Sequence, residues 1–182
     1  MGLPYELKEV PRAELKAPAF LALNPQGSVP VLIDGDLTLT QSVAILEYLN
    51  ERHPQAGLHG QTPKDRAEVR RWLSFCNADL HRTFAIIFGV QTYTDDPATQ
   101  KQLIAKASER LLFLFGIANQ QLADQDYLAG SRSIADPYLY TVLRWARAKE
   151  LALTGMTNLD NFFKRMDADA SVQAALKAQG LN

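Results

Sequence analysis

The sequence predicts a small α/β domain followed by an all-helical domain, and three observations lead to this fold class. Up to Arg52, short β-prone runs alternate with turn residues. From Asp65 onward, apolar residues recur at steps of three and four, which is the spacing of helices that bury one face. Between these parts, residues 53–64 contain two Pro and two Gly without any periodicity. This stretch is therefore predicted to be a linker, so that the domains cover residues 1–53 and 64–182.

Composition and charge limit the function. The chain has 182 residues, 47% of them apolar and 21% charged, as in ordinary soluble globular proteins. A net charge of −1 excludes a general binder of nucleic acid or anionic membranes, because such binders need a clustered basic field. A single Cys cannot form an internal disulfide, and no signal peptide or membrane span is evident. These features predict a cytoplasmic protein without nucleic-acid or membrane partners.

In the first domain, each predicted strand is bounded by turn residues. Residues 5–10 are predicted to form a short strand, and the charges of Glu6, Lys8 and Glu9 suit an edge position. Residues 29–33 are apolar throughout, which is typical of a strand buried on both faces. Residues 34–36, Asp-Gly-Asp, then predict a hairpin turn into a second strand at 37–39. Residues 43–52 have the apolar spacing of a helix.

The second domain is predicted to consist of five helices. They cover residues 66–90, 97–122, 133–151, 157–167 and 169–179. Asp96 followed by Pro97 marks the start of the second of these helices. The third is apolar on most faces and is therefore predicted to be central.

Two features of residues 24–49 point to a binding site. Pro30 interrupts an apolar run, and because Pro lacks a backbone donor it should lie at the start of its strand. General statistics favour a trans bond before it, whereas a cis bond would turn the Val29 backbone outward as a free pairing edge. Gln41 and Ser42 lie where the next helix begins, a place that favours a carboxylate ligand. The simpler alternative is that Thr40 or Ser42 only caps that helix.

Together, these features resemble the glutathione transferase family. The segment NPQGSVPVLIDGDLTLTQSVAILEYLNERHP is similar to its strand–Pro–strand–helix glutathione-binding segment, and SIADPYL is similar to the buried capping box of its helical domain. DLHRTFAIIF and YLYTVLRWARAKEL resemble the bacterial beta-class transferases in particular. The resemblance extends over residues 2–181 and implies a thioredoxin-like glutathione-binding domain followed by a helical domain that helps form the pocket for an electrophile.

The resemblance also implies site residues in the first domain. Val29 would pair its backbone with the cysteinyl part of glutathione, beside a cis bond to Pro30. Gln41 and Ser42 would hold the γ-glutamyl amine and carboxylate. Because Gln41 is neutral where many members carry Glu, its attraction for the ammonium group should be weaker.

In the helical domain, the resemblance gives weaker candidates. His81 matches a beta-class His that reaches the site, although a single His on a helix is usually structural. Asp79, and less strongly Arg82, match positions that reach the partner subunit's site in a homodimer. Cys76 lies among apolar helix positions and is predicted to be a buried free thiol rather than a nucleophile.

The amino terminus departs most from the family pattern. MGLPYELKEV resembles the stretch from the end of the first helix into the second strand, so that a first strand, its turn and most of a helix are expected to be missing. In the family, that turn carries the Ser, Tyr or Cys that activates the glutathione thiol. No residue of this sequence can be assigned that role, and we expect the chain as written to transfer glutathione poorly compared with an extended chain.

Two readings of function follow from the resemblance. The first is a glutathione transferase that joins the thiolate of its co-substrate glutathione to an electrophilic small molecule, as a homodimer without a further cofactor or metal. The second is a non-catalytic or truncated binding protein that keeps the fold without the thiol-activating group.

Overall fold

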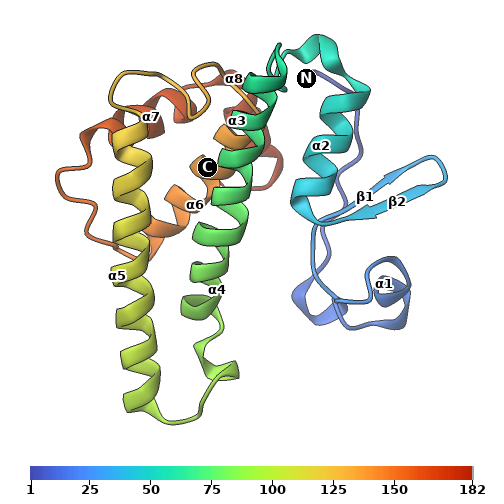
Figure 1. Ribbon diagram of the computed structural model, residues 1–182. Coiled ribbons are helices and arrows are strands. Elements are labelled where there is room, and N and C mark those ends of the chain that lie inside the picture. The colour runs from blue at the N-terminus through green and yellow to red at the C-terminus, as the bar shows by residue number, and fades with distance from the viewer. Residues whose placement is uncertain (182) are drawn as a thin grey trace. The chain divides into compact units, whose positions relative to one another are not determined.

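The structure is a computed structural model that describes residues 1–181. The chain divides into two compact units, Met1–Ala56 and Gly57–Asn182. The first combines a β-hairpin with helices and the second is helical, so the predicted fold class is confirmed (Figure 1).

In the first unit, a hairpin is followed directly by a helix. The elements are the 3₁₀ turn η1 (Arg12–Glu14), α1 (Pro18–Leu23), β1 (Val31–Asp34), β2 (Leu37–Thr40), α2 (Ser42–Arg52) and the 3₁₀ turn η2 (Pro54–Ala56). β1 and β2 pair antiparallel across a two-residue turn, in which Gly35 takes the positive φ of +62° that favours glycine. The Tyr48 hydroxyl of α2 donates a hydrogen bond to Asp34 Oδ2 at 2.7 Å and so fastens the helix to the hairpin.

The prediction of a strand at residues 5–10 is wrong. Within residues 1–181, the only sheet is the two-stranded β1–β2 hairpin, and residues 5–10 are neither paired nor buried in the core. A strand needs a neighbour to accept its backbone hydrogen bonds, and β-propensity alone does not provide one.

The prediction of a strand at residues 29–33 needs a smaller correction. β1 begins at Val31, directly after Pro30, as the missing donor of Pro30 predicted. It is not buried on both faces, however, because the side chain of Ile33 is 59% exposed. Successive side chains of a strand point to opposite faces. Asp34 lies on the side fastened to α2, and Ile33 therefore points the other way.

The second unit is built from six α-helices among the described residues, together with π and 3₁₀ segments. They are α3 (Pro63–Ser74), the π-helical η3 (Phe75–His81), α4 (Arg82–Phe88), the 3₁₀ turn η4 (Val90–Thr92), α5 (Pro97–Gln121), α6 (Ala135–Ala148), α7 (Thr157–Asp167) and α8 (Ala170–Ala178). Several start at side-chain caps. The Thr62 hydroxyl accepts from Asp65 N in a complete capping box, and Asp96 accepts from Thr99 N.

The long helix predicted at residues 66–90 is not one regular α-helix. Its middle turns, η3, are π-helical, and it ends at Phe88. Its apolar positions are nevertheless buried as predicted, among them Leu73, Cys76, Leu80 and Phe84. Steps of three and four do not distinguish an α-helix from a short π segment, which inserts one residue locally and is frequent at functional sites.

The core of the second unit is organised around α6, as predicted. Most of its residues are buried, and it packs against α3, η3 and α7, while α5 lies beside α4 (Figure 1). Before α6, Arg132 Nη1 donates to Asp169 Oδ2 at 2.6 Å and Arg132 Nη2 donates to Ser171 Oγ at 3.0 Å. Arg132 thus ties the start of α6 to the start of α8. None of the helices within residues 1–181 is both long and apolar enough to span a membrane.

Candidate functional site

The Val29–Pro30 peptide bond is cis, as the resemblance predicted against general statistics. The side chain of Val29 is 59% exposed, and the strand ladder begins only at Val31. The backbone of Val29 therefore lies outside the β1–β2 ladder.

A buried amide holds the loop that leads to Val29. Asn24 is 4% exposed, and its Nδ2 donates to Ser28 O at 2.5 Å and to Ser28 Oγ at 3.2 Å. Its Oδ1 accepts from Gln26 N at 3.1 Å. Sequence reasoning missed this role, although Asn24 followed by Pro25 is a recognisable turn signal.

A lysine and a glycine complete this loop. Lys16 Nζ donates to Gln26 O at 2.8 Å and brings a positive charge beside the loop. Gly27 has a φ of +60°, and a Cβ there would lie 2.6 Å from Leu15 O. Only glycine fits this position without displacing the backbone. Neither residue was among the predicted site residues.

Gln41 and Ser42 lie where predicted, at the start of α2. Gln41 is the N-cap residue with φ 73° and ψ 115°, and no side chain caps the helix. The simpler alternative of a capping Thr40 or Ser42 is therefore wrong. The first intrahelical hydrogen bond runs from Ile45 N to Gln41 O at 3.0 Å. The preceding N–H groups, together with the Ser42 hydroxyl, form a place that favours an anion.

One hydrogen bond joins the two halves of this candidate site. Gln41 Nε2 donates to Gln26 Oε1 at 3.2 Å, across fifteen residues of sequence. Gln26 belongs to the loop that Asn24 holds and that continues into Val29. The structure thus brings the predicted residues Val29, Pro30, Gln41 and Ser42 together in the first unit.

His81, the candidate in the second unit, is the last residue of the π segment η3. Its Nδ1 lies 2.8 Å from the Tyr138 hydroxyl, and its ring meets the ring of Trp145 edge-on at 4.8 Å between centroids. Partial burial lowers the pKa of His81 below its ordinary value. The imidazole is therefore predominantly neutral at neutral pH.

Asp79 and Arg82 lie on either side of His81 along the helix. Asp79 Oδ1 is 3.9 Å from Arg110 Nη2 of α5, at the outer limit of an ion pair, and both side chains are about half exposed. Arg82 is exposed at the first position of α4. Pairs with this exposure contribute little to stability, so these charges remain available to other partners.

Cys76 is a buried free thiol, as predicted. It is 0% exposed, and burial raises its pKa far above the ordinary value. A thiol with a raised pKa stays protonated and is a poor nucleophile.

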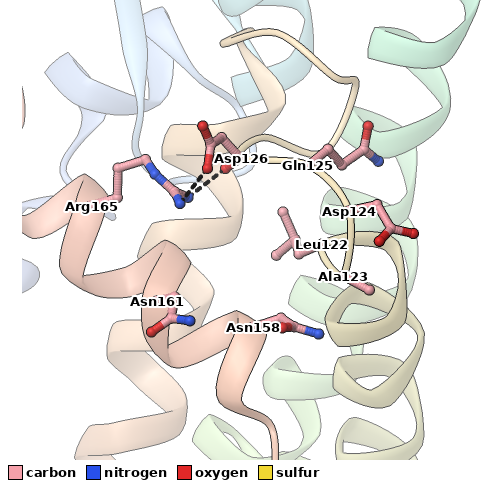
Figure 2. A pocket seen from close by; sticks show the side chains of 8 residues that line it. All are labelled: Leu122, Ala123, Asp124, Gln125, Asp126, Asn158, Asn161 and Arg165. Carbon is pink, nitrogen blue, oxygen red and sulfur yellow. Dashed lines mark hydrogen bonds and ion pairs between the residues drawn. The ribbon is translucent and has the colours of Figure 1, made fainter.

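A polar hollow lies elsewhere in the second unit, between the end of α5 and α7 (Figure 2). Two of its charged groups pair with each other, since Arg165 Nη1 donates to Asp126 O at 2.7 Å and Arg165 Nη2 lies 2.5 Å from Asp126 Oδ1. It is lined by Leu122, Ala123, Asp124, Gln125, Asp126, Asn158, Asn161 and Arg165. None of the predicted site residues is among them.

Comparison with known proteins identifies the family. Residues 1–52 match the N-terminal domain of glutathione S-transferases, and residues 81–169 match the C-terminal domain. Glutathione S-transferase GST-4.5 of Xanthomonas campestris is 44% identical over 182 residues, which cover 99% of this chain and 89% of the relative. A glutathione S-transferase from Xylella fastidiosa superposes with a TM-score of 0.95 at 41% identity, covering 100% of this chain and 89% of that one. A bacterial beta-class glutathione S-transferase from Sphingomonas chungbukensis superposes with a TM-score of 0.78 at 31% identity, covering 90% of this chain and 79% of that one.

The cis-Pro hairpin, the uncapped start of α2 and the all-helical second unit make up the two-part fold, thioredoxin-like and then helical, of the solved glutathione transferases that this chain superposes on. The chain belongs to the glutathione S-transferase family. Its solved relatives include the beta class, as the segments around His81 and Trp145 predicted. The relatives support the transferase reading and not the non-catalytic alternative.

Proposed function

We propose that Val29, Pro30, Gln41 and Ser42 bind glutathione as the co-substrate of this transferase, without a further cofactor or metal. The γ-glutamyl carboxylate would accept hydrogen bonds from the Ser42 hydroxyl and the first-turn N–H groups of α2. The cysteinyl backbone would pair with the N–H and C=O of Val29. Solved relatives from a sulfitobacter and a sphingomonad hold glutathione, which supports this ligand.

The observation that carries the proposal is the backbone of Gln41. A non-glycine residue at φ 73° costs about 1–3 kcal/mol and persists only where the surroundings enforce it. Here the strained residue leaves the start of α2 uncapped and turns its amide toward Gln26. A capping residue without strain would stabilise the helix better, so the arrangement is better explained by ligand binding than by folding.

In the reaction, the glutathione thiol loses its proton, and the thiolate sulfur forms a bond to an electrophilic carbon. The leaving group departs with the electron pair of the broken bond. Among residues 1–181 we assign no thiol-activating Ser, Tyr or Cys, and we propose His81 as the candidate that contacts the reacting groups. In a homodimer, Asp79 and Arg82 would act at the site of the partner subunit. We place this chemistry in the cytoplasm, in keeping with the single Cys.

The role of Gln41 predicts that Gln41→Glu tightens glutathione binding by about 1 kcal/mol, or roughly fivefold. A charge-assisted hydrogen bond to the γ-glutamyl ammonium is about twice as strong as a neutral one. Calorimetric titration at low salt measures the change. The control ligand is N-acetylglutathione, which lacks the ammonium group and should show no gain. If both ligands gain equally, Gln41 does not contact the amine.

We propose a homodimer built from the helix of residues 66–88 and its neighbour α5. Large apolar side chains remain exposed on these helices, with Phe88 at 43%, Phe113 at 59% and Ile117 at 38%. Phe113 and Ile117 are one helical turn apart and share a face. Sedimentation equilibrium at micromolar concentration should give twice the chain mass of 20.2 kDa, and Phe113→Glu should lower it. A single 20.2 kDa species for the unsubstituted protein would refute the dimer.

A further inference from the structure

Three polar groups from two helical segments form a chain of hydrogen bonds in the second unit. The Tyr138 hydroxyl of α6 donates to Asn77 Oδ1 at 2.8 Å. The same hydroxyl oxygen lies 2.8 Å from His81 Nδ1. Asn77 and His81 both belong to the π segment η3, and Tyr138 lies 61 and 57 residues further along the chain.

Counting protons fixes the direction of this chain. A tyrosine hydroxyl has one proton, and because the amide oxygen Asn77 Oδ1 can only accept, the 2.8 Å contact assigns that proton to the bond with Asn77. The contact with His81 can then be a hydrogen bond only if His81 Nδ1 carries a proton and donates it to the Tyr138 oxygen. In a neutral imidazole, the other nitrogen, Nε2, is then the acceptor.

We propose that Asn77 and Tyr138 are positioning residues that fix His81 as the Nδ1–H tautomer and so leave the lone pair of Nε2 free. This inference rests on the proposed role of His81 in the site, because a free Nε2 matters there as an acceptor for a thiol proton or a substrate donor. The second ring nitrogen of a histidine is commonly set in this way by the bond that the first one makes.

The surroundings keep this arrangement intact. The ring of His81 meets the rings of Tyr138 and Trp145 edge-on, at 5.9 and 4.8 Å between centroids, which limits rotation of the imidazole. Burial raises the pKa of Tyr138 to about 12, so that its hydroxyl keeps its proton at neutral pH. The contacts therefore hold both the orientation of the ring and the direction of the hydrogen bonds.

Substitution of Asn77 tests the direction of the chain. Asn77 is exposed, so its replacement should leave the core unchanged. In Asn77→Ala, the Tyr138 proton loses its acceptor and can turn to His81 Nδ1, so that the Nε2–H tautomer becomes populated. In Asn77→Asp, acceptor oxygens remain and the Nδ1–H tautomer should persist. Tyr138→Phe removes the acceptor for Nδ1–H and should also populate the Nε2–H tautomer.

The measurement is two-bond ¹H–¹⁵N correlation NMR of histidine-labelled protein at pH 8, where imidazoles are neutral. The protein has three histidines, and His81→Gln identifies the signals of His81. The unsubstituted protein should show a protonated Nδ1 and an unprotonated Nε2. Tyr140→Phe is the matched control, because the Tyr140 hydroxyl on the same helix donates to Asp167 Oδ1 at 2.6 Å and not to His81. This variant should leave the His81 signals unchanged.

Two results would overturn the inference: a protonated Nε2 in the unsubstituted protein, or an unchanged His81 pattern in both Asn77→Ala and Tyr138→Phe. The proposed role of His81 is decided separately by the conjugation rate of His81→Ala relative to the unsubstituted protein. An unchanged rate would refute that role even where the NMR result confirms the tautomer.

Discussion

Asp136→Ala is expected to lower the free energy of unfolding of the helical unit by about 3–5 kcal/mol. Asp136 is 0% exposed, and its carboxylate accepts from Leu128 N at 3.0 Å, from Ser133 N at 2.7 Å and from Ser133 Oγ at 3.0 Å. Removing the carboxylate leaves buried N–H groups without an acceptor, each at a cost of ~1–3 kcal/mol, and it also leaves a small cavity. Because the total free energy of unfolding of a domain is only about 5–15 kcal/mol, this substitution would remove a large part of the stability.

Urea unfolding followed by circular dichroism, at one fixed protein concentration, measures this loss. The control is Asp160→Ala on α7, because Asp160 Oδ1 pairs with Arg147 Nη2 at 2.9 Å but is 52% exposed. That substitution should cost less than about 1 kcal/mol. The loss of unfolding free energy in Asp136→Asn should lie between the losses in Asp136→Ala and Asp160→Ala, since an amide keeps one acceptor oxygen. A loss at Asp136→Ala no larger than that at Asp160→Ala would contradict a structural role for the buried carboxylate.

The elements that sequence reasoning predicted correctly are those with strong local signals. The cis bond at Pro30, the start of α2 at Gln41 and Ser42, and the helices after Asp96 and around Trp145 follow from nearby residues or from the resemblance. The strand at residues 5–10 failed because pairing depends on a partner elsewhere in the chain. The prediction of one regular α-helix over residues 66–90 failed because a short π segment keeps apolar residues at almost the same spacing as an α-helix does.

The candidate site shows the same limit. Val29, Gln41 and Ser42 lie within one contiguous segment, and their arrangement could be predicted from it. The bonds that organise their surroundings were not predictable, because a Gln26–Gln41 or His81–Tyr138 contact joins residues 15 and 57 positions apart. No local pattern records such a pairing. Asn24 lies at the start of the segment 24–49, but its burial depends on how the loop closes around it.

Ser42→Ala has the second large expected effect and acts on ligand binding rather than on folding. Ser42 is the first residue of α2, where no side chain caps the helix, and its hydroxyl would donate to the γ-glutamyl carboxylate. A hydrogen bond to a charged group contributes ~1.5–3 kcal/mol, which corresponds to a loss of roughly tenfold to hundredfold in affinity. The helix itself should lose little, because the Ser42 side chain makes no capping hydrogen bond.

Calorimetric titration of glutathione into the unsubstituted protein, Ser42→Ala and Thr38→Ala is the most direct test of the proposal that this family member binds glutathione at the start of α2. Thr38 is exposed on β2 and provides the control, because its replacement removes a hydroxyl of the same kind outside the proposed site. We expect Thr38→Ala to bind as tightly as the unsubstituted protein and Ser42→Ala to bind roughly tenfold to hundredfold more weakly. Equal affinities for all three proteins would contradict the proposed site and would remove Ser42 from the residues that bind glutathione.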